Sequence, residues 1–541
     1  MSEAPGTPAP AALTGQGATI PIANLPAIDA EMDLTVRQTV DFGDLDARKI
    51  VLVTPPYERI AQGYEFVKHI TNRSPSLGLL HLAAAVREEG YEPSIIESDI
   101  FDLSPDEVVA QILRDKPAFV GITLFTVGTW VASEIARKIK LKRPDIKIII
   151  GGPHVSSMGA ETMERFPEFD VAVVGEGEEV LIRLLKAWRE GTPLQEVPAL
   201  FFRDPDALNV RVISTPKLAI NKDLDRLPFP AWDLLPDFPN AYLPAVYDFP
   251  QGPVASIAAS RGCPFHCKFC DTSTFGASVR AYTPERVFEM MQHLQQRWGI
   301  KHVLFVDDLF TASKKRTTKL CNLIIDSGLQ MTWSCASRVD VINPETLKLM
   351  KQAGCWEMSF GLESGSNELL QKMDKSASLD KSVRAIHWAH DAGIRSKGLF
   401  MLGYPGENEE TMAQTKAFVK SIPLTIMNLT KFTPYPGSPI YRDIYGTNIR
   451  DDHWEKMNGM NFIWTAEGLS RERLNQMYRQ ILTAFYSQHR VGKNYALLTL
   501  RYPRHLLRFC KFLGAMVKSK VKARFAGLRG RRDDGAMVSL D

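Results

Sequence analysis

Three cysteines within eight residues constrain this chain more than any other feature. They lie in the segment R-G-C-P-F-H-C-K-F-C as Cys263, Cys267 and Cys270. Thiolates are the soft ligands that iron–sulfur clusters and zinc select. A structural zinc site is usually built from two C-x2-C pairs, and the sequence holds no second pair. We therefore predict an iron–sulfur cluster with one iron left open. The alternative is a truncated zinc knuckle that uses His266 as its fourth ligand.

The other four cysteines are scattered singly. The total of seven is odd, which argues against a disulfide framework and for a reducing compartment. Cys335 and Cys355 lie in predicted strands, where a single cysteine is usually a small buried hydrophobe. A substrate-facing or radical-quenching thiol is the alternative for these two. The remaining single cysteines are Cys321 and Cys510.

The spacing C-x3-C-x-Φ-C, with Phe269 as the aromatic Φ, resembles the cluster motif of the radical S-adenosylmethionine (SAM) superfamily. The resemblance implies a [4Fe–4S] cluster whose open iron chelates SAM. It also implies that an electron from the cluster cleaves SAM to a 5′-deoxyadenosyl radical, and that Phe269 lies near the adenine. Such an enzyme takes its electrons from a donor such as a flavodoxin or a ferredoxin.

Length and charge set further limits. A chain of 541 residues is too long for one ordinary domain. Its net charge of +3 gives no reason to expect a nucleic-acid partner. Residues 1–45 contain a Pro/Ala-rich stretch with neither a basic start nor an apolar core, so we predict a disordered leader rather than a signal peptide. No uninterrupted apolar run is long enough to predict a membrane-spanning helix.

The first folded domain is predicted at residues 46–195, where apolar strands alternate with helical patterns. This alternation predicts a parallel, doubly wound, Rossmann-like α/β sheet. Such sheets bind ligands outside the carboxyl ends of their strands, and small residues gather there in this chain. The expected strands are 49–54, 94–99, 118–124, 147–152 and 171–178, and the expected helices are 76–90, 105–114, 131–142 and 180–189.

In this order, the helix start S-P-S-L-G-L-L-H-L-A and the turns G-G-P-H and V-G-E-G-E resemble the cobalamin-binding domain that precedes many radical SAM modules. The histidine motif D-x-H-x-x-G of cobalamin-dependent mutases is missing. His154 is therefore predicted either as a cofactor contact or as a polar turn residue. The resemblance implies that cobalamin is bound by Thr54, Ser76, Leu77, Gly78, Thr123, Gly151, Gly152, His154, Gly175, Glu176 and Gly177.

After a Pro-rich linker at 196–250, six further strand–helix units predict a second domain at residues 251–445. The linker pattern D-x-L-P-x-P-x-W-D also resembles the connector of this two-domain family. Six units predict a partial (β/α)6 barrel, with its chemistry at the carboxyl-terminal ends of the strands. The expected strands are 254–260, 302–310, 332–340, 357–365, 395–407 and 428–437.

Polar residues follow these strands where SAM would lie. An acidic group suits the SAM ammonium, an arginine suits its carboxylate and a glutamate suits its ribose diol. The patterns F-V-D-D, G-L-E-S-G-S, G-Y-P-G-E and P-Y-P-G-S-P resemble the barrel of the cobalamin-dependent branch. Alternatively, Asp308 caps the next segment and Glu363 pairs with a barrel lysine. The resemblance assigns SAM binding to Asp307, Asp308, Arg338, Glu363, Ser364 and Tyr404, together with Phe269.

The region 446–541 is predicted to be helical and to end in a basic tail. Between Arg501 and Arg532 many Lys and Arg alternate with apolar residues, and no Asp or Glu occurs. This composition is typical of a helix that lies on anionic lipid. A helix docked on the barrel with a solvated basic face is the alternative. The prediction is a cytoplasmic protein whose tail contacts the inner face of the membrane.

Together these features predict a cobalamin-dependent radical SAM enzyme that methylates an unactivated carbon of a membrane-associated, polycyclic or isoprenoid lipid. The domain order also resembles the anaerobic magnesium-protoporphyrin monomethyl ester cyclase, so oxidative ring closure of a tetrapyrrole is the second hypothesis. A non-catalytic cobalamin- or redox-sensing module is the hypothesis from a different class.

Overall fold

The computed structural model describes residues 42–56, 72–204, 211–446, 451–511, 513–514 and 517. The predicted leader lies outside the described residues as far as residue 41, and so does most of the basic tail beyond residue 511. Among the described residues, no helix is long and apolar enough to cross a bilayer.

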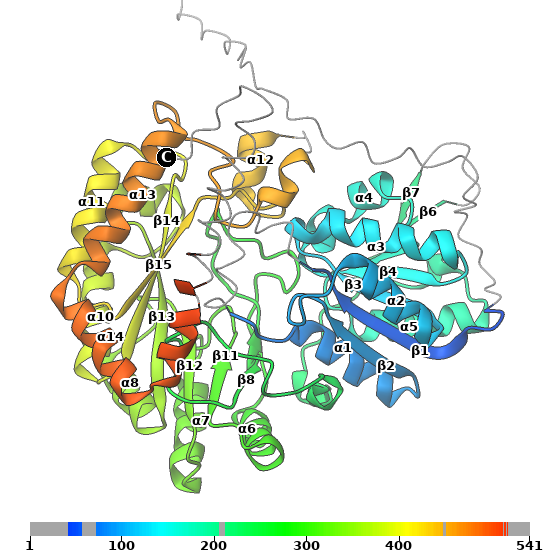
Figure 1. The fold of residues 1–541 in the computed structure, drawn as a ribbon, viewed down its shortest axis with the longest axis horizontal. Helices are drawn as coiled ribbons and strands as arrows, with labels where there is room; N and C mark the ends of the chain where they lie inside the picture. The colour runs from blue at the N-terminus through cyan, green and yellow to red at the C-terminus, as the bar shows by residue number, and fades with distance from the viewer. Residues whose placement is uncertain are drawn as a thin grey trace, which may run out of the picture. The chain divides into compact units, whose positions relative to one another are not determined.

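The N-terminal domain is built on a seven-stranded sheet in the order β2-β1-β3-β4-β5-β6-β7 (Figure 1). The five predicted strands are confirmed, and all of them run parallel. Two short antiparallel strands extend the sheet and lie in the stretch that the sequence predicts as linker. The strands are β1 (Asp46–Thr54), β2 (Glu92–Glu97), β3 (Pro117–Thr123), β4 (Lys147–Gly151), β5 (Val171–Val173), β6 (Leu200–Arg203) and β7 (Val212–Ser214).

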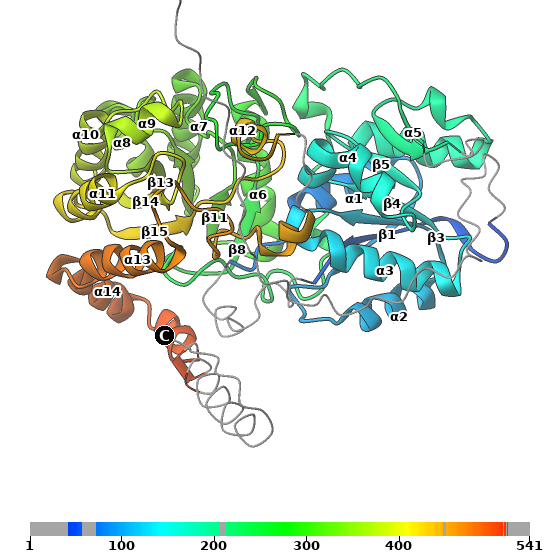
Figure 2. The same ribbon diagram turned by 90° about the horizontal axis from the view of Figure 1, so that it is seen from above.

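Helices cover both faces of this sheet, as its doubly wound connectivity requires (Figure 2). Four of them match the predicted helices. The fifth, α4, follows Gly152 and was not predicted, because its start reads as a Gly-Gly-Pro turn and Met158 breaks the helical geometry inside it. The helices are α1 (Leu77–Glu88), α2 (Pro105–Asp115), α3 (Thr129–Lys142), α4 (Pro153–Arg165) and α5 (Glu178–Glu190).

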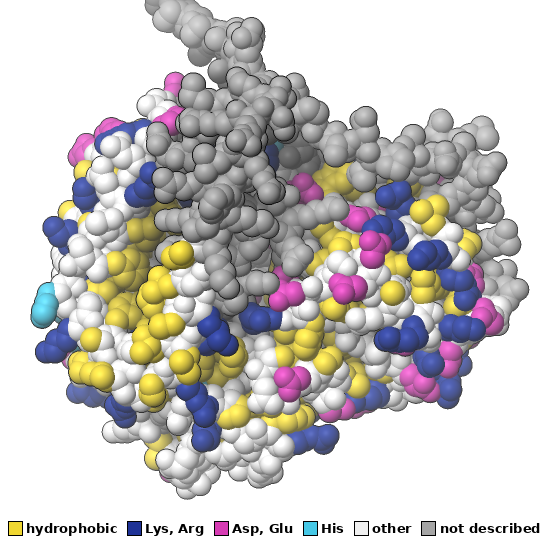
Figure 3. Space-filling model, viewed as in Figure 1, with side chains coloured by type: hydrophobic (Ala, Val, Ile, Leu, Met, Phe, Trp, Pro, Cys, Tyr) yellow, Lys and Arg dark blue, Asp and Glu magenta, His cyan; other side chains and the backbone are white. Residues whose placement is uncertain are grey.

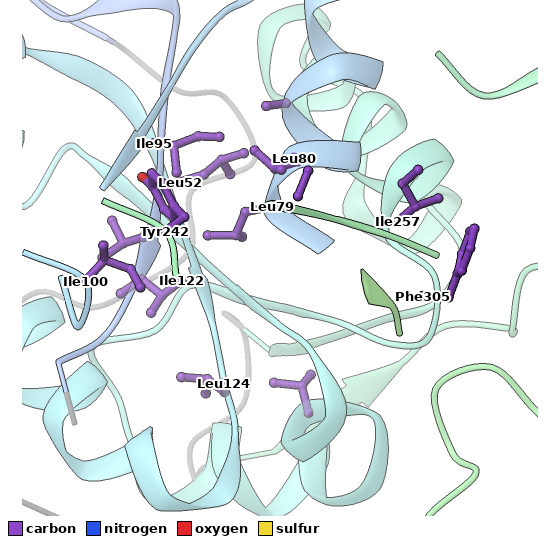
Figure 4. Packing of buried hydrophobic residues seen from close by; sticks show 14 of the residues in the cluster. Leu52, Leu79, Leu80, Ile95, Ile100, Ile122, Leu124, Tyr242, Ile257 and Phe305 are labelled. Atoms are coloured by element: carbon purple, nitrogen blue, oxygen red, sulfur yellow. The ribbon is translucent and has the colours of Figure 1, made fainter. Parts of the chain in front are cut away.

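The core of the N-terminal domain is formed by aliphatic side chains from the central strands and from α1. Leu52, Leu80 and Ile122 are buried there, and Tyr242 of the linker reaches into the same cluster (Figure 4). Ile257 and Phe305 belong to the barrel and form part of the same continuous cluster. The linker and both sheets therefore share one hydrophobic core.

The second domain is an open sheet of six parallel strands in the order β15-β14-β13-β12-β11-β8. Spatial order follows chain order, so the sheet is the predicted partial barrel, with helices on its outer side (Figure 1). The strands are β8 (Val254–Ile257), β11 (His302–Phe305), β12 (Thr332–Ser337), β13 (Cys355–Glu363), β14 (Arg395–Leu402) and β15 (Ile426–Lys431). The helices are α6 (Pro284–Trp298), α7 (Lys314–Ser327), α8 (Pro344–Gln352), α9 (Asn367–Lys372), α10 (Leu379–Asp391) and α11 (Glu409–Ser421).

Beyond the barrel, the described chain forms α12 (Pro439–Tyr445), the 3-10 helix η7 (Asp451–Lys456), α13 (Arg471–Tyr486) and α14 (His489–Arg501). Helix α13 packs on α11 and β15, whereas η7 contacts α3 and the turn η3 (Thr126–Gly128) of the N-terminal domain. The C-terminal region therefore contacts both domains.

The buried histidines of this fold make its stability depend on pH. His302 is fully buried in β11 between the hydroxyls of Thr332 (2.8 Å) and Ser334 (3.1 Å), and burial lowers its pKa to about 3. In the unfolded chain the imidazole of His302 binds a proton near pH 6.5, whereas in the folded protein it stays neutral down to about pH 3. The stability that His302 contributes is therefore fully present above pH 6.5 and is lost as the pH falls below that value.

Between pH 7 and pH 5 we expect the wild type to lose about 2 kcal/mol more of its unfolding free energy than His302→Gln loses. Urea titrations at the two pH values measure it. The exposed His387 of α10 provides the control, because His387→Gln should follow the wild type. An equal loss in the wild type and His302→Gln would contradict the prediction.

Candidate functional site

The cysteine loop is held between two short strands at the carboxyl end of β8. Ser260–Arg261 (β9) pairs with Arg280–Ala281 (β10) in an antiparallel ribbon, so the loop leaves and returns at one point. Gly262 adopts a φ of +87°, and a Cβ there would collide with the carbonyl oxygen of Ser278. Glycine is therefore required immediately before Cys263.

Asp307 and Asp308 fasten the start of this loop. Asp307 accepts hydrogen bonds from the Ala259 N–H (3.0 Å) and from the Ser260 hydroxyl, and Asp308 accepts one from the Gly262 N–H (3.1 Å). Burial raises the pKa of Asp307 to about 6. The structure thus gives both carboxylates a role in supporting the loop, and their contact with SAM stays a prediction.

Cations lie beside the cysteines. The Arg338 guanidinium stacks on Phe265 (3.6 Å), and its Nη1 lies 3.6 Å from the Cys267 sulfur. Asp340 holds this arginine through an ion pair of 2.8 Å. Burial raises the pKa of the Cys267 thiol, and the positive charges of Lys375 and Arg338 oppose that shift. Positive charge here would stabilise a thiolate ligand.

Glu363 forms a buried ion pair with Lys375, as the alternative sequence interpretation expects. Glu363 has a φ of +62°, which is uncommon for a residue with a side chain. A Cβ on Gly361 would collide with both partners, so the strand leaves room for the pair. The ammonium of Lys375 also lies 5.8 Å from the ring of Phe269, which places the pair beside the cysteine loop.

The last two predicted SAM residues, Ser364 and Tyr404, are both buried. The Ser364 hydroxyl lies 3.3 Å from that of Thr415 and accepts a hydrogen bond from the Ser366 N–H. Tyr404 is buried, and its ring meets Phe432 edge-on in the cluster against which Phe269 packs. The contact of Ser364 and Tyr404 with SAM stays a prediction.

Among the described residues, no three His, Cys, Asp or Glu side chains converge on the position of a single metal ion. A four-iron cluster makes a different demand, because each thiolate binds a separate iron. Cys267 is buried, Cys263 is half-buried and Cys270 is exposed. The three thiols therefore lie at different depths in the loop, from its buried side to its surface. This set of three soft donors with adjacent cations fits an iron–sulfur cluster.

The predicted cobalamin residues gather at the carboxyl ends of the N-terminal strands. Thr123 and Gly151 are partners in the β3–β4 register, and Thr54 is the partner of Glu97 in β1–β2. Ser76 donates its N–H to Glu97 (2.7 Å) just before Leu77 and Gly78 open α1.

The two glycine turns are fixed by their backbone. Gly152 has a φ of +103°, and a Cβ there would lie 3.0 Å from both the Thr123 hydroxyl and the Leu124 carbonyl oxygen. Gly175 has a φ of +76° and donates its N–H to Ser156 (3.1 Å). Gly177 packs against Leu82 of α1, while Glu176 is engaged with arginines of the barrel. The missing side chains of Gly152 and Gly177 therefore make room for neighbouring residues of the same domain.

A cavity of about 470 Å³ lies where these strand ends face the barrel. The N-terminal domain contributes Thr126 and His154, the barrel contributes Asp271 and Tyr435, and the C-terminal region contributes Met457. The remaining lining residues are Phe125, Val127, Pro153, Pro436 and Asn458. The lining is mostly apolar, and His154 is the one predicted cobalamin residue among these lining residues, so the cavity suits an apolar ligand beside the strand ends.

His154 lines this cavity without a free ring nitrogen. Its Nδ1 lies 3.1 Å from the Thr126 hydroxyl and its Nε2 lies 3.1 Å from that of Thr162. Its ring meets Trp454 edge-on at 4.5 Å, and burial lowers its pKa to about 3. Both ring nitrogens that could bind a metal are therefore occupied, and the contact of His154 with a cofactor stays a prediction.

Several residues of the site were not predicted from the sequence. Arg261, Glu178 and Arg280 form ion pairs between the domains, and Trp454 backs the cavity from a segment that carries no motif. The arginine directly before the cysteine loop was a visible signal. Its partners could not be inferred, because they lie 83 residues or more away in sequence.

The fold and the site define a two-domain class in which a cofactor-binding α/β domain is joined to a cysteine-loop barrel. The chain matches the B12 binding domain over residues 66–185 and the Radical SAM superfamily over residues 257–419. It is 31% identical to an uncharacterized methyltransferase of Pyrococcus horikoshii, covering 82% of this chain and 93% of the relative. The chain therefore belongs to the cobalamin-dependent radical SAM family, and it is an enzyme that uses a [4Fe–4S] cluster, SAM and cobalamin.

Other relatives differ in chemistry. The anaerobic magnesium-protoporphyrin IX monomethyl ester cyclase of Rubrivivax gelatinosus is 28% identical over 75% of this chain and 72% of its own. The hopanoid C-3 methylase of Methylococcus capsulatus is 27% identical over 68% of each chain. The fold is similar to the radical SAM methyltransferase TsrM of Kitasatospora setae, with a TM-score of 0.65 at 16% identity, covering 88% of this chain and all of that one.

The cysteine loop provides the first test of the site. Cys267→Ala removes the buried ligand, so we expect the anaerobically reconstituted variant to lose the brown iron–sulfur chromophore and 5′-deoxyadenosine formation together. Absorbance spectra and product analysis measure both losses. Cys510→Ala, at an exposed thiol of the tail, is the control and should keep both. A variant that keeps a full cluster without Cys267 would contradict the ligand assignment.

Proposed function

We propose that this enzyme methylates an unactivated carbon of a membrane-associated lipid, with a polycyclic or isoprenoid skeleton as the substrate class. The observation that carries the proposal is the cavity shared by the strand ends of the N-terminal domain and the barrel. Asp271, directly after Cys270, is one of its walls, so the predicted cluster loop borders the space where the cofactors and a substrate would meet.

When bound, the cluster and SAM would supply a 5′-deoxyadenosyl radical that removes a hydrogen atom from the substrate, and cobalamin would supply the methyl group. The side chains of the protein arrange this chemistry. Cys263, Cys267 and Cys270 would hold the cluster, and Gly152 and Gly175 would let the backbone approach the corrin. Phe125 and Tyr435 give the cavity apolar surface that would exclude water from a radical.

The described part of the C-terminal tail supports a membrane-associated substrate. One side is docked: His505 is buried against Phe249, and Arg508 donates to the Pro244 carbonyl oxygen (2.8 Å). The other side is bare, because Leu500 is 80% exposed and Leu507 is 67% exposed. Figure 3 shows hydrophobic side chains on the face of the molecule that carries α13 and α14.

Charge makes an anionic bilayer the best partner for this bare side. Between His489 and Arg532 the sequence holds thirteen Lys or Arg and no Asp or Glu. Apolar residues insert at the boundary of the lipid head groups, while each nearby cation adds about 1 kcal/mol of attraction to anionic lipid. The docked side and the bare side are different, so a docked helix and a membrane contact, which the sequence treats as alternatives, are compatible in this segment.

Oxidative ring closure of a tetrapyrrole is the second candidate. Similarity to the cyclase of Rubrivivax gelatinosus favours it, and the mixed apolar and polar lining of the cavity suits a porphyrin as well as a lipid. The two candidates differ in their products, because ring closure transfers no methyl group.

A direct test is anaerobic reconstitution with iron, sulfide, cobalamin, SAM and reductant, in the presence of total lipid from a deletion strain of the source organism. We expect 5′-deoxyadenosine and transfer of the isotope from methyl-labelled SAM into the lipid fraction, detected by mass spectrometry. The Cys267→Ala protein is the control for labelling that does not depend on the cluster. Formation of 5′-deoxyadenosine with label absent from every lipid would favour the cyclase reaction.

The membrane face is tested by vesicle flotation. In a Leu500→Asp, Leu507→Asp double variant we expect binding to phosphatidylglycerol vesicles to fall by about tenfold or more, because two leucines no longer insert. The control is Ile325→Asp on α7, where an apolar side chain is 39% exposed beside Asp326 and lies outside the cationic tail. Equal binding of both variants would remove the membrane argument.

A further inference from the structure

The cysteine loop is flanked by two charged residues that both reach the N-terminal domain. Arg261 lies two positions before Cys263, and Asp271 directly follows Cys270. Each contacts one of the two glycine turns or the helix that begins there. The loop is therefore attached to the predicted cobalamin site at its start and at its end.

The contact at the start of the loop is a buried cluster of four charges. Arg261 donates to Glu178 (2.6 Å) and lies 3.4 Å from Glu176, and Arg280 pairs with Glu176 from the opposite strand of the ribbon. The Arg261 side chain is only 5% exposed. Two arginines match two glutamates, so the cluster is neutral. Buried ion pairs of this kind add little net stability, because the cost of desolvating the charges offsets their attraction. They fix the geometry of the contact when every charge has a partner.

The contact at the end of the loop uses the N-terminal end of α4. The Ser157 hydroxyl donates to Asp271 (3.0 Å) and lies 3.0 Å from the Ser273 hydroxyl. The neighbouring Ser156 accepts the N–H of Gly175. Gly437 leaves space for this contact, because a Cβ there would collide with both Ser157 and Asp271. The N-terminal end of α4 therefore joins one glycine turn to the other and to the loop.

We propose that Arg261 and Asp271 are positioning residues that set the separation between the cluster and the cobalamin. A loop attached at one end could pivot about that point, whereas attachment at both ends fixes its distance and its orientation. Reaction geometry of this kind tolerates displacements of well under 1 Å, so rigid support matters. The inference rests on the proposed function for its purpose, while the two contacts themselves are properties of the fold.

The test uses the full chain loaded anaerobically with iron, sulfide and hydroxocobalamin. The variants are Glu178→Gln, Ser157→Ala and their double, which weaken the two contacts without changing a predicted cysteine ligand. The matched control is Asp233→Asn, which breaks an ion pair of 2.7 Å between α1 and the linker, away from the loop. Dithionite reduction makes both centres paramagnetic, and electron paramagnetic resonance then measures the magnetic interaction between them, which falls steeply with distance.

We expect the interaction to fall by about twofold or more in the double variant, to fall less in each single variant, and to stay unchanged in Asp233→Asn. Iron and cobalamin contents should match the wild type. Formation of 5′-deoxyadenosine without substrate should stay within about twofold, because the predicted SAM residues are untouched.

Two results would overturn the inference. One is a magnetic interaction between the two centres that is as strong in the double variant as in Asp233→Asn. The other is loss of iron or cobalamin together with a lowered melting temperature, which would show that the contacts hold the fold and not the spacing. If no protein forms 5′-deoxyadenosine, the proposed function fails instead, and the magnetic measurement still decides the inference.

Discussion

The hydrogen bonds that Asp307 and Asp308 accept from the backbone before the cysteine loop are the interaction on which the site depends. The loop has some apolar contact of its own, because Phe269 packs against the cluster of Tyr404 and Phe432, but this contact lies at the end of the loop and leaves the backbone at its start in need of polar partners. Two carboxylates at the end of β11 satisfy the N–H groups of Ala259 and Gly262 and connect the loop to the barrel sheet. Burial of Asp307 makes this support strong, because an unpaired group there would be costly.

Around that support, the structure uses hydrophobic and charged contacts for different purposes. One continuous apolar core, with Leu80 on one side and Phe305 on the other, joins the two sheets through the linker. It supplies stability but little directional precision. The ion pairs of Arg261 and the Ser157–Asp271 hydrogen bond are directional, and they lie next to the predicted cofactors. Stability and alignment thus come from separate sets of residues.

Some parts of the fold could not be predicted from the sequence, and each failure has a physical reason. Helix α4 was hidden because its first residues, Gly152 and Pro153, are typical of a turn and Met158 interrupts its helical geometry. Strands β6 and β7 are too short for their period to be read, and they pair with a sheet edge that sequence does not reveal. Glu363 was predicted as a ligand residue or a partner of a lysine, and only the fold shows that Lys375 is that lysine.

The sequence by itself determined the order of the domains, the parallel strands of both sheets and the cysteine loop that identifies the chemistry. These features depend on local spacing and on periodic burial, which are written along the chain. Only the tertiary structure decided that His154 has both nitrogens occupied, that Glu176 faces arginines, and that Arg261 and Asp271 join the loop to the other domain. Those facts depend on contacts between residues far apart in sequence, and one chain without its fold does not specify which distant groups will meet.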